Sequence, residues 1–443
     1  MYDITIVGAG ICGMNLCHLL LKKGYKNILL LEKSNRLGGL IQSKYVKFNN
    51  KTIKRKSGQQ SNKTQKKIHN KKIKYEAGAA VVFDYQENMK NLIKEFDIDV
   101  IEIPLDGRND KQYWDGSKRK TPLGKSTTEK FLGLMKKVFD YMEKMGNTHC
   151  RKFTFEQMCL QVLTFEETRL LEFCYGYSSE FRIANSVVAK KNIENELFKS
   201  NKMFFFRKGY SSLIHAMHNS ISNTNVTMRK NTSLNHFKDT SNNTVELTIH
   251  DSATKKNETI KTKKMVFAIP REALVKMCGC FTNEELGLFN SVEPSSLSRV
   301  FARYDMNKRE NEWMKKLRHS TVNNPLRQII PTKKSIGLFQ ISYSDWQSAD
   351  LWGTLSEKDC KIQLKKMLKQ TFHDKKIDDP KWFDKIYWPN AIHYWRPNIN
   401  EKTIHKKIIH LRPNIFVGGE SFSLNQGWCE GAVQTSIEIS KLL

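Results

Sequence analysis

Three glycines near the start of the chain, Gly8, Gly10 and Gly13, follow the spacing G-x-G-x-x-G. Glycine at these positions permits a tight turn, a close approach of a pyrophosphate to the backbone, and close packing of a helix on a strand. Glu32 follows 19 positions after Gly13, and a carboxylate at about that distance accepts hydrogen bonds from a ribose. The residue types and their spacing therefore predict a dinucleotide site.

The residues around these glycines predict the elements that would position them. Residues 4–7 form a short apolar run that is typical of a buried strand, and residues 14–22 place their leucines on one face of a helix. Residues 27–31 predict a second strand, which ends at Glu32. The start of the helix offers free N–H groups and the positive end of its dipole to a phosphate. Together these elements make a complete βαβ unit.

Two further stretches carry small residues that let a backbone pass close to a ligand. Gly38 and Gly39 are adjacent, and Arg36 just before them would contribute a cation near a phosphate. Gly78 and Ala79 form the second stretch. A plain NAD-binding Rossmann domain needs no second glycine element, so this pattern favours FAD as the cofactor.

The end of the chain predicts another strand and helix. Residues 414–417 predict a strand, which stops at paired glycines, the second of which is Gly419, followed by Glu420. A helix is predicted over 432–442, directly behind Gly431. Its N-terminus could meet a phosphate or the pyrimidine edge of a flavin. These elements would complete a nucleotide site that begins at residue 8.

The composition is that of a globular protein of 443 residues with a formal net charge of +29, and the length predicts two or three domains. The charge has two explanations, attraction to a polyanion or solvated lysines in a Lys- and Asn-rich chain. No nucleic-acid motif accompanies it, which favours the second. Residues 47–74 contain eleven Lys or Arg and no acid. This segment cannot form a core, so it is either a solvated insertion or a weak contact for a polyanion or nucleic acid.

The nine cysteines are scattered, and none has zinc spacing with a histidine. We therefore expect reduced thiols, no metal and an intracellular protein. The first residues enter a strand directly, without a signal peptide. No apolar run approaches the roughly 20 residues that a membrane span needs. The expectation is a soluble, cytoplasmic protein with no membrane span, and the sequence does not indicate its oligomeric state.

Four separated blocks make the chain resemble the flavin-containing amine oxidoreductase family, which includes the monoamine and polyamine oxidases. The blocks are residues 7–13 with Glu32, 36–39, 267–270, and 417–420 with 426–432. The resemblance implies an α/β fold in which a Rossmann-like FAD-binding domain, a parallel sheet with helices, is interleaved with an α+β substrate-binding domain.

The family's organisation also implies domain boundaries. The discontinuous FAD-binding domain would comprise residues 1–84, 200–290 and 408–443, with the basic low-complexity insertion at 47–74. The substrate domain would comprise residues 85–199 and 291–407.

The resemblance also implies roles for single residues. Trp428 matches the position whose aromatic ring flanks the substrate beside the flavin, and its partner would come from His393, Tyr394 or Trp395. Such a pair can align an amine and exclude water. The implied cofactor contacts are Gly8, Gly10 and Gly13 (pyrophosphate), Glu32 (adenosine ribose), Arg36, Gly38, Gly39, Gly78 and Ala79 (along the cofactor), Gly419 and Glu420 (ribityl or pyrophosphate), and Gly431, Ala432 and Val433 (isoalloxazine edge).

Three departures from the family pattern bear on the chemistry. Leu40 replaces an arginine that many members have after the paired glycines. Arg299 is the nearest match to a lysine beside the flavin, and an arginine is permanently charged and serves poorly as a base; this argues against rapid oxidation by oxygen. No cysteine lies in 387–395, where covalently flavinylated relatives attach their cofactor, so we expect non-covalent FAD.

The leading hypothesis is an FAD-dependent oxidoreductase that moves a hydride from a carbon next to an amine nitrogen to flavin N5, with oxygen as acceptor and hydrogen peroxide as product. Two alternatives share the nucleotide blocks. One is a flavoprotein like protoporphyrinogen oxidase or a desaturase. The other is a low-turnover flavoprotein with a basic binding or packaging role.

Overall fold

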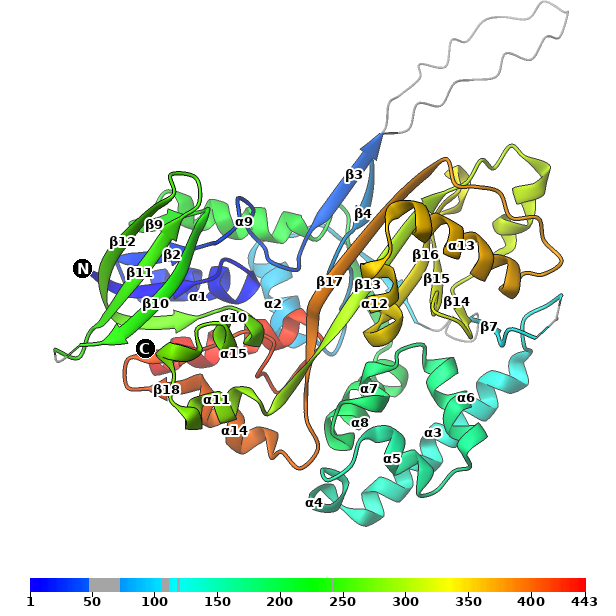
Figure 1. Ribbon diagram of the computed structural model, residues 1–443, viewed down its shortest axis with the longest axis horizontal. Coiled ribbons are helices and arrows are strands. Elements are labelled where there is room, and N and C mark those ends of the chain that lie inside the picture. The colour runs from blue at the N-terminus through cyan, green and yellow to red at the C-terminus, as the bar shows by residue number, and fades with distance from the viewer. Residues whose placement is uncertain (48–71, 106–110, 118–119, 241) are drawn as a thin grey trace, which may run out of the picture.

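The computed structural model describes residues 1–47, 72–105, 111–117, 120–240 and 242–443. Two large sheets lie beside each other, and a group of helices, α3 to α8, lies next to the second sheet (Figure 1). Both chain termini lie at the first sheet. The predicted mixed α/β architecture with a parallel-containing sheet is confirmed, while the domain boundaries stay a prediction.

The first sheet has a parallel centre and antiparallel additions. β19, β12, β1, β2 and β9 lie in this order and pair in parallel, whereas β10–β11–β12 and β18–β19 pair antiparallel. The strands come from three separated parts of the chain. They are β1 (Tyr2–Val7), β2 (Ile28–Leu31), β9 (Val226–Arg229), β10 (Thr232–Asp239), β11 (Val245–Asp251), β12 (Lys256–Phe267), β18 (His410–Arg412) and β19 (Ile415–Val417).

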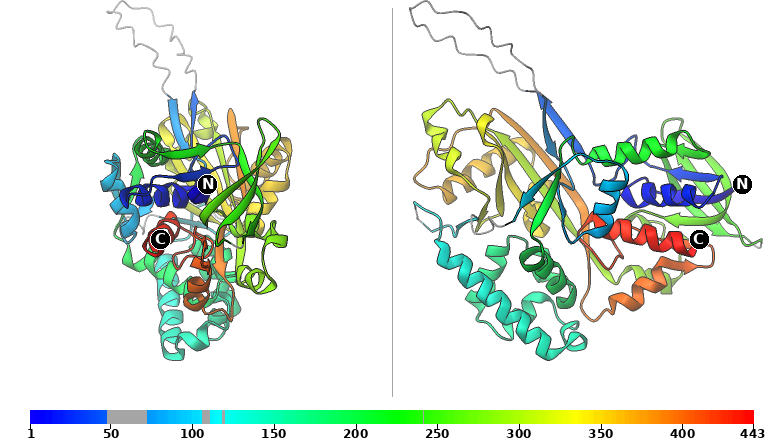
Figure 2. Two further views of the ribbon diagram at one scale, coloured as in Figure 1. Left: turned by 90° about the vertical axis from the view of Figure 1, so that its left-hand side faces the viewer. Right: turned by 180° about the vertical axis from the view of Figure 1, so that it is seen from behind.

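Both faces of this sheet are covered, which explains why its central strands are apolar without alternation. Ile4 and Ile6 of β1 pack under the helices of one face, whereas Val7 packs into the core on the other face. The first layer consists of α1 (Ile11–Lys22), α2 (Glu87–Glu95), α9 (Ser211–Ser222) and α15 (Cys429–Leu442). In the right view of Figure 2, α1 (blue) and α15 (red) lie next to each other. The opposite face is covered by α10 (Arg271–Val275), α11 (Asn283–Phe289) and α14 (Glu401–Ile409).

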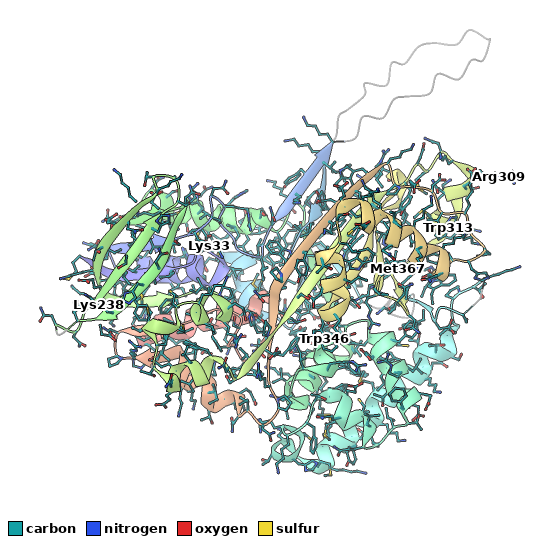
Figure 3. All side chains as sticks on the ribbon, in the orientation of Figure 1. Lys33, Lys238, Arg309, Trp313, Trp346 and Met367 are labelled. Carbon is teal, nitrogen blue, oxygen red and sulfur yellow. The ribbon has the colours of Figure 1, made fainter. Side chains whose placement is uncertain are left out.

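The second sheet has the order β17-β13-β16-β15-β14-β7. Its strands are β7 (Gln112–Trp114), β13 (Val292–Arg303), β14 (Ser320–Val322), β15 (Gln328–Lys333), β16 (Leu338–Asp345) and β17 (Trp382–Trp395). One face packs against α12 (Trp346–Thr354) and α13 (Glu357–Thr371), in a core that includes Met367 and the partly buried Trp313 (Figure 3). The aromatic residues of 382–395 thus belong to one long strand.

The helices beside this sheet have a core of their own. They are α3 (Lys125–Met145), α4 (Asn147–Cys150), α5 (Phe155–Leu160), α6 (Phe165–Tyr175), α7 (Ser179–Arg182) and α8 (Ser186–Glu194), continued by a π-helical turn, η2 (Asn195–Lys199). Capping boxes at Thr154 and Thr164 set the starts of α5 and α6. Two small sheets, β3 (Ser43–Lys47) with β4 (Lys72–Glu76), and β5 (Val82–Phe83), β8 (Lys202–Phe206) and β6 (Val100–Pro104), connect these parts.

Among the described residues, every helix is too short or too polar to pass through a bilayer. Most of the basic segment 47–74 lies outside the described residues.

Candidate functional site: a nucleotide crevice next to a buried acidic cluster

The three glycines of the first turn have different tasks. Gly8 has φ +106°, and a Cβ there would lie 2.5 Å from the Ala268 carbonyl oxygen. A Cβ on Gly13 would lie 1.9 Å from the carbonyl oxygen of Gly8, so α1 can approach β1 only with glycine here. A Cβ on Gly10 would meet no atom within 4 Å. Gly10 therefore faces open space at the start of α1, where a pyrophosphate can approach.

Glu32 is 9% exposed at the end of β2 and turns back to this loop. Its Oε2 accepts from the Ala9 amide at 3.0 Å, and its Oε1 accepts from the amide and hydroxyl of Ser34 at 2.9 and 2.8 Å. A carboxylate has about four acceptor positions, so Oε2 keeps capacity for a ribose hydroxyl. The predicted role of Glu32 is compatible with this geometry.

Arg36 lies near the crevice but is committed to its own loop. Its Nη1 donates to the carbonyls of Leu37 and Ile41 at 3.0 Å each, and its Nη2 donates to the Gly39 carbonyl at 2.6 Å. The Gly38 amide donates to the Ala9 carbonyl at 2.8 Å, which joins this loop to the first turn. In this structure Arg36 shapes the paired-glycine turn, and the expected phosphate contact would need these bonds to rearrange.

Gly78 and Ala79 pack on the same segment. A Cβ on Gly78 would lie 1.8 Å from the carbonyl oxygen of Leu40, and the Ala79 amide donates to that oxygen at 3.2 Å. Glycine is thus required here by contact between two backbone segments. Arg299 and Trp388 fix the residues just before Gly78: Arg299 donates to the Glu76 carbonyl at 3.1 Å, and Trp388 donates to the Ala77 carbonyl at 2.8 Å.

The C-terminal strand brings its glycines to the same edge of the sheet. β19 pairs with β12 through Val417 and Phe267, and β12 pairs with β1 through Phe267 and Val7. Gly419, with φ +115°, therefore lies at the same strand ends as the Gly8 turn. Ligands of parallel α/β sheets bind outside the carboxyl ends of the strands, so the predicted nucleotide blocks converge on one crevice.

Helix α15 begins at Cys429, three residues earlier than expected. A Cβ on Gly431 would lie 2.1 Å from the Ser423 hydroxyl oxygen, so close packing against the preceding loop already requires glycine there. Val433 is buried, Ala432 is 7% exposed, and Asn15 of α1 donates to the Ser436 hydroxyl of α15 at 2.7 Å. The starts of α1 and α15 are thereby held side by side.

Glu420 and His393 form a buried group at this edge. His393 is 1% exposed, with Nδ1 2.9 Å from Glu420 Oε2 and Nε2 2.9 Å from Glu272 Oε2. The other oxygen of Glu420 accepts from the amides of His393 and Gly427 at 3.1 and 2.7 Å. Since both ring nitrogens of His393 are engaged by carboxylates, the structure does not present this ring as a partner of Trp428.

The aromatic neighbour of Trp428 is Phe83, which the sequence analysis missed. The two rings meet edge-to-face with centroids 5.1 Å apart, and Phe83 stacks on Tyr85 at 5.7 Å. Tyr394 lies in the core of the helical group, and Trp395 donates its Nε1 to the Ser423 carbonyl. The signal available in the sequence was an aromatic residue shortly after the Gly78–Ala79 stretch.

An acidic cluster, defined as Glu180, Glu196, Tyr175 and Asn192, lies in the helical group next to the loop that precedes Trp428. The Tyr175 hydroxyl donates to Glu180 and lies 3.3 Å from Glu196, and Asn192 Nδ2 donates to Glu180 at 3.0 Å. Asn192 also reaches the Gln426 carbonyl at 3.5 Å, two residues before Trp428. Burial, together with the nearby Glu196 and Glu180 charges, raises the pKa of Tyr85, and the Tyr85 ring stacks on Phe83.

Glu180 is 4% exposed, and burial raises the pKa of its carboxyl. Its hydrogen-bond partners, Tyr175 and Asn192, are neutral. Glu196 is on η2, and π-helical turns are rare and frequent at functional sites. The cluster thus brings two carboxyl groups together in the predicted substrate region, the buried Glu180 and the partly exposed Glu196.

Arg299 is 6% exposed, and its guanidinium carbon lies 4.6 Å from the centre of the Tyr343 ring. Tyr343 contacts Tyr177 edge-to-face at 5.6 Å, and Tyr177 contacts Tyr175 of the cluster at 5.5 Å. Nε of Arg299 is buried without a hydrogen-bond partner in the structure. A chain of aromatic contacts therefore connects Arg299 to the acidic cluster.

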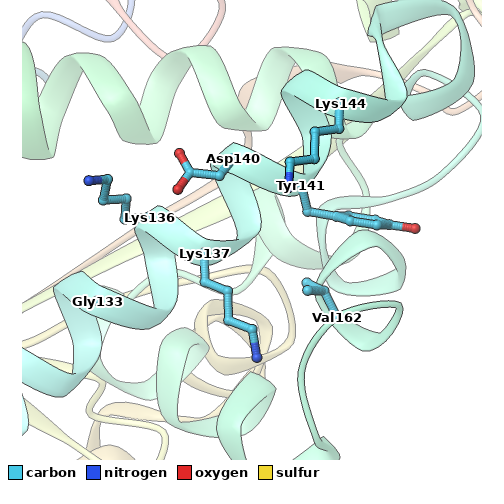
Figure 4. A pocket seen from close by; sticks show the side chains of 7 residues that line it. All are labelled: Gly133, Lys136, Lys137, Asp140, Tyr141, Lys144 and Val162. Atoms are coloured by element: carbon cyan, nitrogen blue, oxygen red, sulfur yellow. The ribbon is translucent and has the colours of Figure 1, made fainter.

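Two surface hollows lie outside this arrangement. One, of about 410 Å³, is lined by Lys136, Lys137 and Lys144 of α3 (Figure 4); its positive charge does not suit a cationic ligand. The other, of about 760 Å³, lies between α9 and residues 35–45. Neither includes the first-turn glycines or Trp428.

The crevice fits the FAD that the resemblance implies. Gly10 leaves open space beside the start of α1, and Glu32 keeps an acceptor position for a ribose hydroxyl. Cys429, which follows Trp428 directly, has its pKa raised by burial to about 11, which does not favour a reactive thiolate.

A comparison with the curated proteins gave no match. The family model described as flavin containing amine oxidoreductase matches residues 11–442, nearly the whole chain. This match includes the first-turn helix, the acidic cluster and the C-terminal glycine loop, and it implies FAD as the cofactor and a small molecule as the substrate. The chain belongs to the flavin-containing amine oxidoreductase family.

Proposed function

We propose that the protein oxidises an amine, taking a hydride from the carbon next to the amine nitrogen, with oxygen as electron acceptor. The observation that supports this substrate is the acidic cluster next to the loop that precedes Trp428. A protonated amine is a small-molecule cation that Glu180 and Glu196 would attract. The Phe83 and Trp428 rings offer the aromatic faces that cations also favour.

The electrostatics of Glu180 support a cationic ligand. A buried carboxylate is costly unless a cation or several hydrogen bonds offset the loss of water. Glu180 has neutral partners, and its pKa is raised by burial. An ammonium group bound nearby would offset that cost, so substrate binding and ionisation of Glu180 favour each other.

The chain's own residues bind and orient the amine; they do not perform the redox chemistry. When bound, FAD supplies the acceptor, because a hydride can pass to flavin N5 and oxygen can then take the two electrons to give hydrogen peroxide. Trp428 and Phe83 would shield the amine from water. Arg299 remains charged and is a poor base, so we assign it no proton transfer; the ammonium group gives its proton to solvent before the hydride leaves, and the neutral amine reacts.

The same residues argue against the desaturase-like and porphyrinogen-oxidising alternatives. A hydrocarbon gains nothing from these carboxylates, and a porphyrinogen bears carboxylates that Glu180 and Glu196 would repel. The basic binding role depends on residues 47–74, most of which lie outside the described residues.

The test is a visible absorption spectrum of the purified protein, followed by anaerobic addition of monoamines, diamines and polyamines. We expect a flavin spectrum that bleaches with one amine class and recovers in air with release of hydrogen peroxide. A flavin spectrum that no amine bleaches would contradict the proposal.

Substitutions then test the acidic cluster. Glu180→Gln should raise the amine KM by about tenfold or more, because a hydrogen bond to a charged group contributes about 1.5–3 kcal/mol. Glu166→Gln is the matched control, since Glu166 is an exposed acid on nearby α6, and it should leave KM unchanged. Trp428→Ala should lose turnover while retaining FAD. Equal KM values for the Glu180 and Glu166 variants would show that the cluster does not bind the amine.

A further inference from the structure

His393 of β17 is held between carboxylates from two other segments. Glu272 comes from α10, directly after β12, and Glu420 comes from the loop after β19. The ring nitrogens lie 2.9 Å from each carboxylate, and the Ser421 hydroxyl lies 3.2 Å from Nδ1. The second sheet is thereby joined to the strand ends that form the nucleotide crevice.

This geometry requires a charged imidazole. A neutral ring has one N–H and one lone pair, so one of the two carboxylates would face a lone pair. Burial acts to lower the pKa of His393, but the bonds to Glu272 and Glu420 outweigh it and raise the pKa to about 9. Three other groups lie around this trio. Arg271 lies 3.4 Å from Glu272, and the charge of Glu420 contributes to the raised pKa of Cys429. The β13 residue opposite His393 is Pro294, which does not titrate.

Glu420 in turn fixes the loop that precedes α15. Its Oε1 accepts from the Gly427 amide at 2.7 Å, which closes the loop from Gly419 to Gly427. Gly419 starts this loop with φ +115° and donates its amide to Thr435 Oγ1 of α15 at 2.9 Å. The loop lies at the same strand ends as Gly8 and Gly10. A change at His393 would therefore alter the loop that borders the cofactor crevice.

We propose that His393 is a positioning residue for the cofactor: as a cation between Glu272 and Glu420, it holds the 419–427 loop in the conformation that receives FAD. Loss of that charge leaves two carboxylates close together with one hydrogen bond fewer, and the loop loses its fixed geometry. The proposal depends on the FAD of the family and not on the amine substrate, so FAD binding tests it separately from turnover.

The test measures the dissociation constant of FAD between pH 6 and pH 10, by dilution of the full-length holoenzyme and flavin fluorescence. We expect a constant value up to about pH 8 and then a rise of up to about tenfold per pH unit, as for one linked proton. His393→Gln should bind FAD more weakly at pH 7 and show no such rise. Glu272→Gln removes one of the two carboxylates and should move the rise to lower pH.

His405→Gln is the matched control. His405 is also buried and also contacts this loop, through the Phe422 carbonyl at 2.7 Å, but it faces one carboxylate, Glu438. This variant should keep the pH midpoint of the unaltered protein even where its affinity falls. A His393→Gln protein with the original affinity and pH profile would overturn the proposal. If that variant does not fold, a Glu272→Gln midpoint at the original pH would overturn it equally.

Discussion

Gly13→Ala and Gly10→Ala should fail for different physical reasons, although both change the same motif. A Cβ on Gly13 would lie 1.9 Å from the Gly8 carbonyl oxygen. Ordinary contact begins at 3.4 Å, so α1 would have to move from β1 by about 1.5 Å, and overpacking of this kind costs about 1–3 kcal/mol or more. Gly10 has φ −72° and open space, so alanine fits, at a cost of about 1 kcal/mol because Gly10 is the N-cap of α1.

Calorimetry and FAD titration distinguish the two effects. Protein freed of FAD should have a Tm lowered by a few degrees with Gly13→Ala, and by less with Gly10→Ala. FAD affinity, in contrast, should fall strongly with Gly10→Ala, because the new methyl group occupies the space left for the pyrophosphate. The control is Gly133→Ala, because Gly133 is helical and has open space beside it. Gly24→Ala is unsuitable, because φ at Gly24 is +88°. Unchanged FAD affinity in Gly10→Ala would refute the placement of the pyrophosphate.

Two further predictions concern ion contacts that hold the elements together. Glu430 accepts hydrogen bonds from the Asn88 amide, the Asn88 side chain and the Met89 amide at 3.1, 2.7 and 2.9 Å. Glu430→Gln should therefore lower the free energy of unfolding, measured in urea, by about 1–2 kcal/mol. An unchanged free energy of unfolding would contradict this prediction. Glu401 accepts from Arg151 Nε and Nη2 at 2.7 and 2.8 Å, and although burial acts to raise the pKa of Glu401, these bonds lower it below 4.5. The resulting stability is present above pH 4.5 and lost as the pH falls through the lowered pKa. Arg151→Met should therefore flatten the loss of stability between pH 5 and pH 3, and an unaltered slope would contradict the assignment.

The nucleotide blocks could be predicted because their physics is local. Gly8 and Gly13 are required by contacts within one βαβ unit, and Glu32 folds back onto that same unit. The spacing of these residues is therefore independent of how the rest of the chain folds, and it can be recognised in the sequence. Gly78 and Gly431 were also identified, but the structure gives them a packing role, since a Cβ would strike Leu40 or Ser423. Sequence alone cannot separate a glycine that admits a ligand from one that admits a neighbouring segment.

The surroundings of Trp428 could not be predicted because they depend on distant segments. Phe83 comes from a two-residue strand that pairs with β8, more than 100 positions further along the chain. The acidic cluster likewise needs α6 to end at Tyr175, α7 to begin at Ser179 and α8 to continue into η2. No periodic pattern marks Glu180 as buried or places it near Glu196, because both occur in sequences that are typical of solvated helices.

The three candidate partners of Trp428 on β17, His393, Tyr394 and Trp395, differ in the face of the strand that they occupy. Side chains alternate along β17, so His393 and Trp395 share one face while Tyr394 points to the other, into the core of the helical group. The pairing of β13 with β17 also shifts register between Ser295 and Leu297, which breaks any simple extrapolation from residues 382–388. Adjacent residues of a regular strand therefore serve opposite faces. The acidic partners of His393 then explain why a histidine, and not a larger aromatic residue, occupies the face toward the cofactor crevice: that position joins two carboxylates, and among the three candidates only imidazole can donate to both.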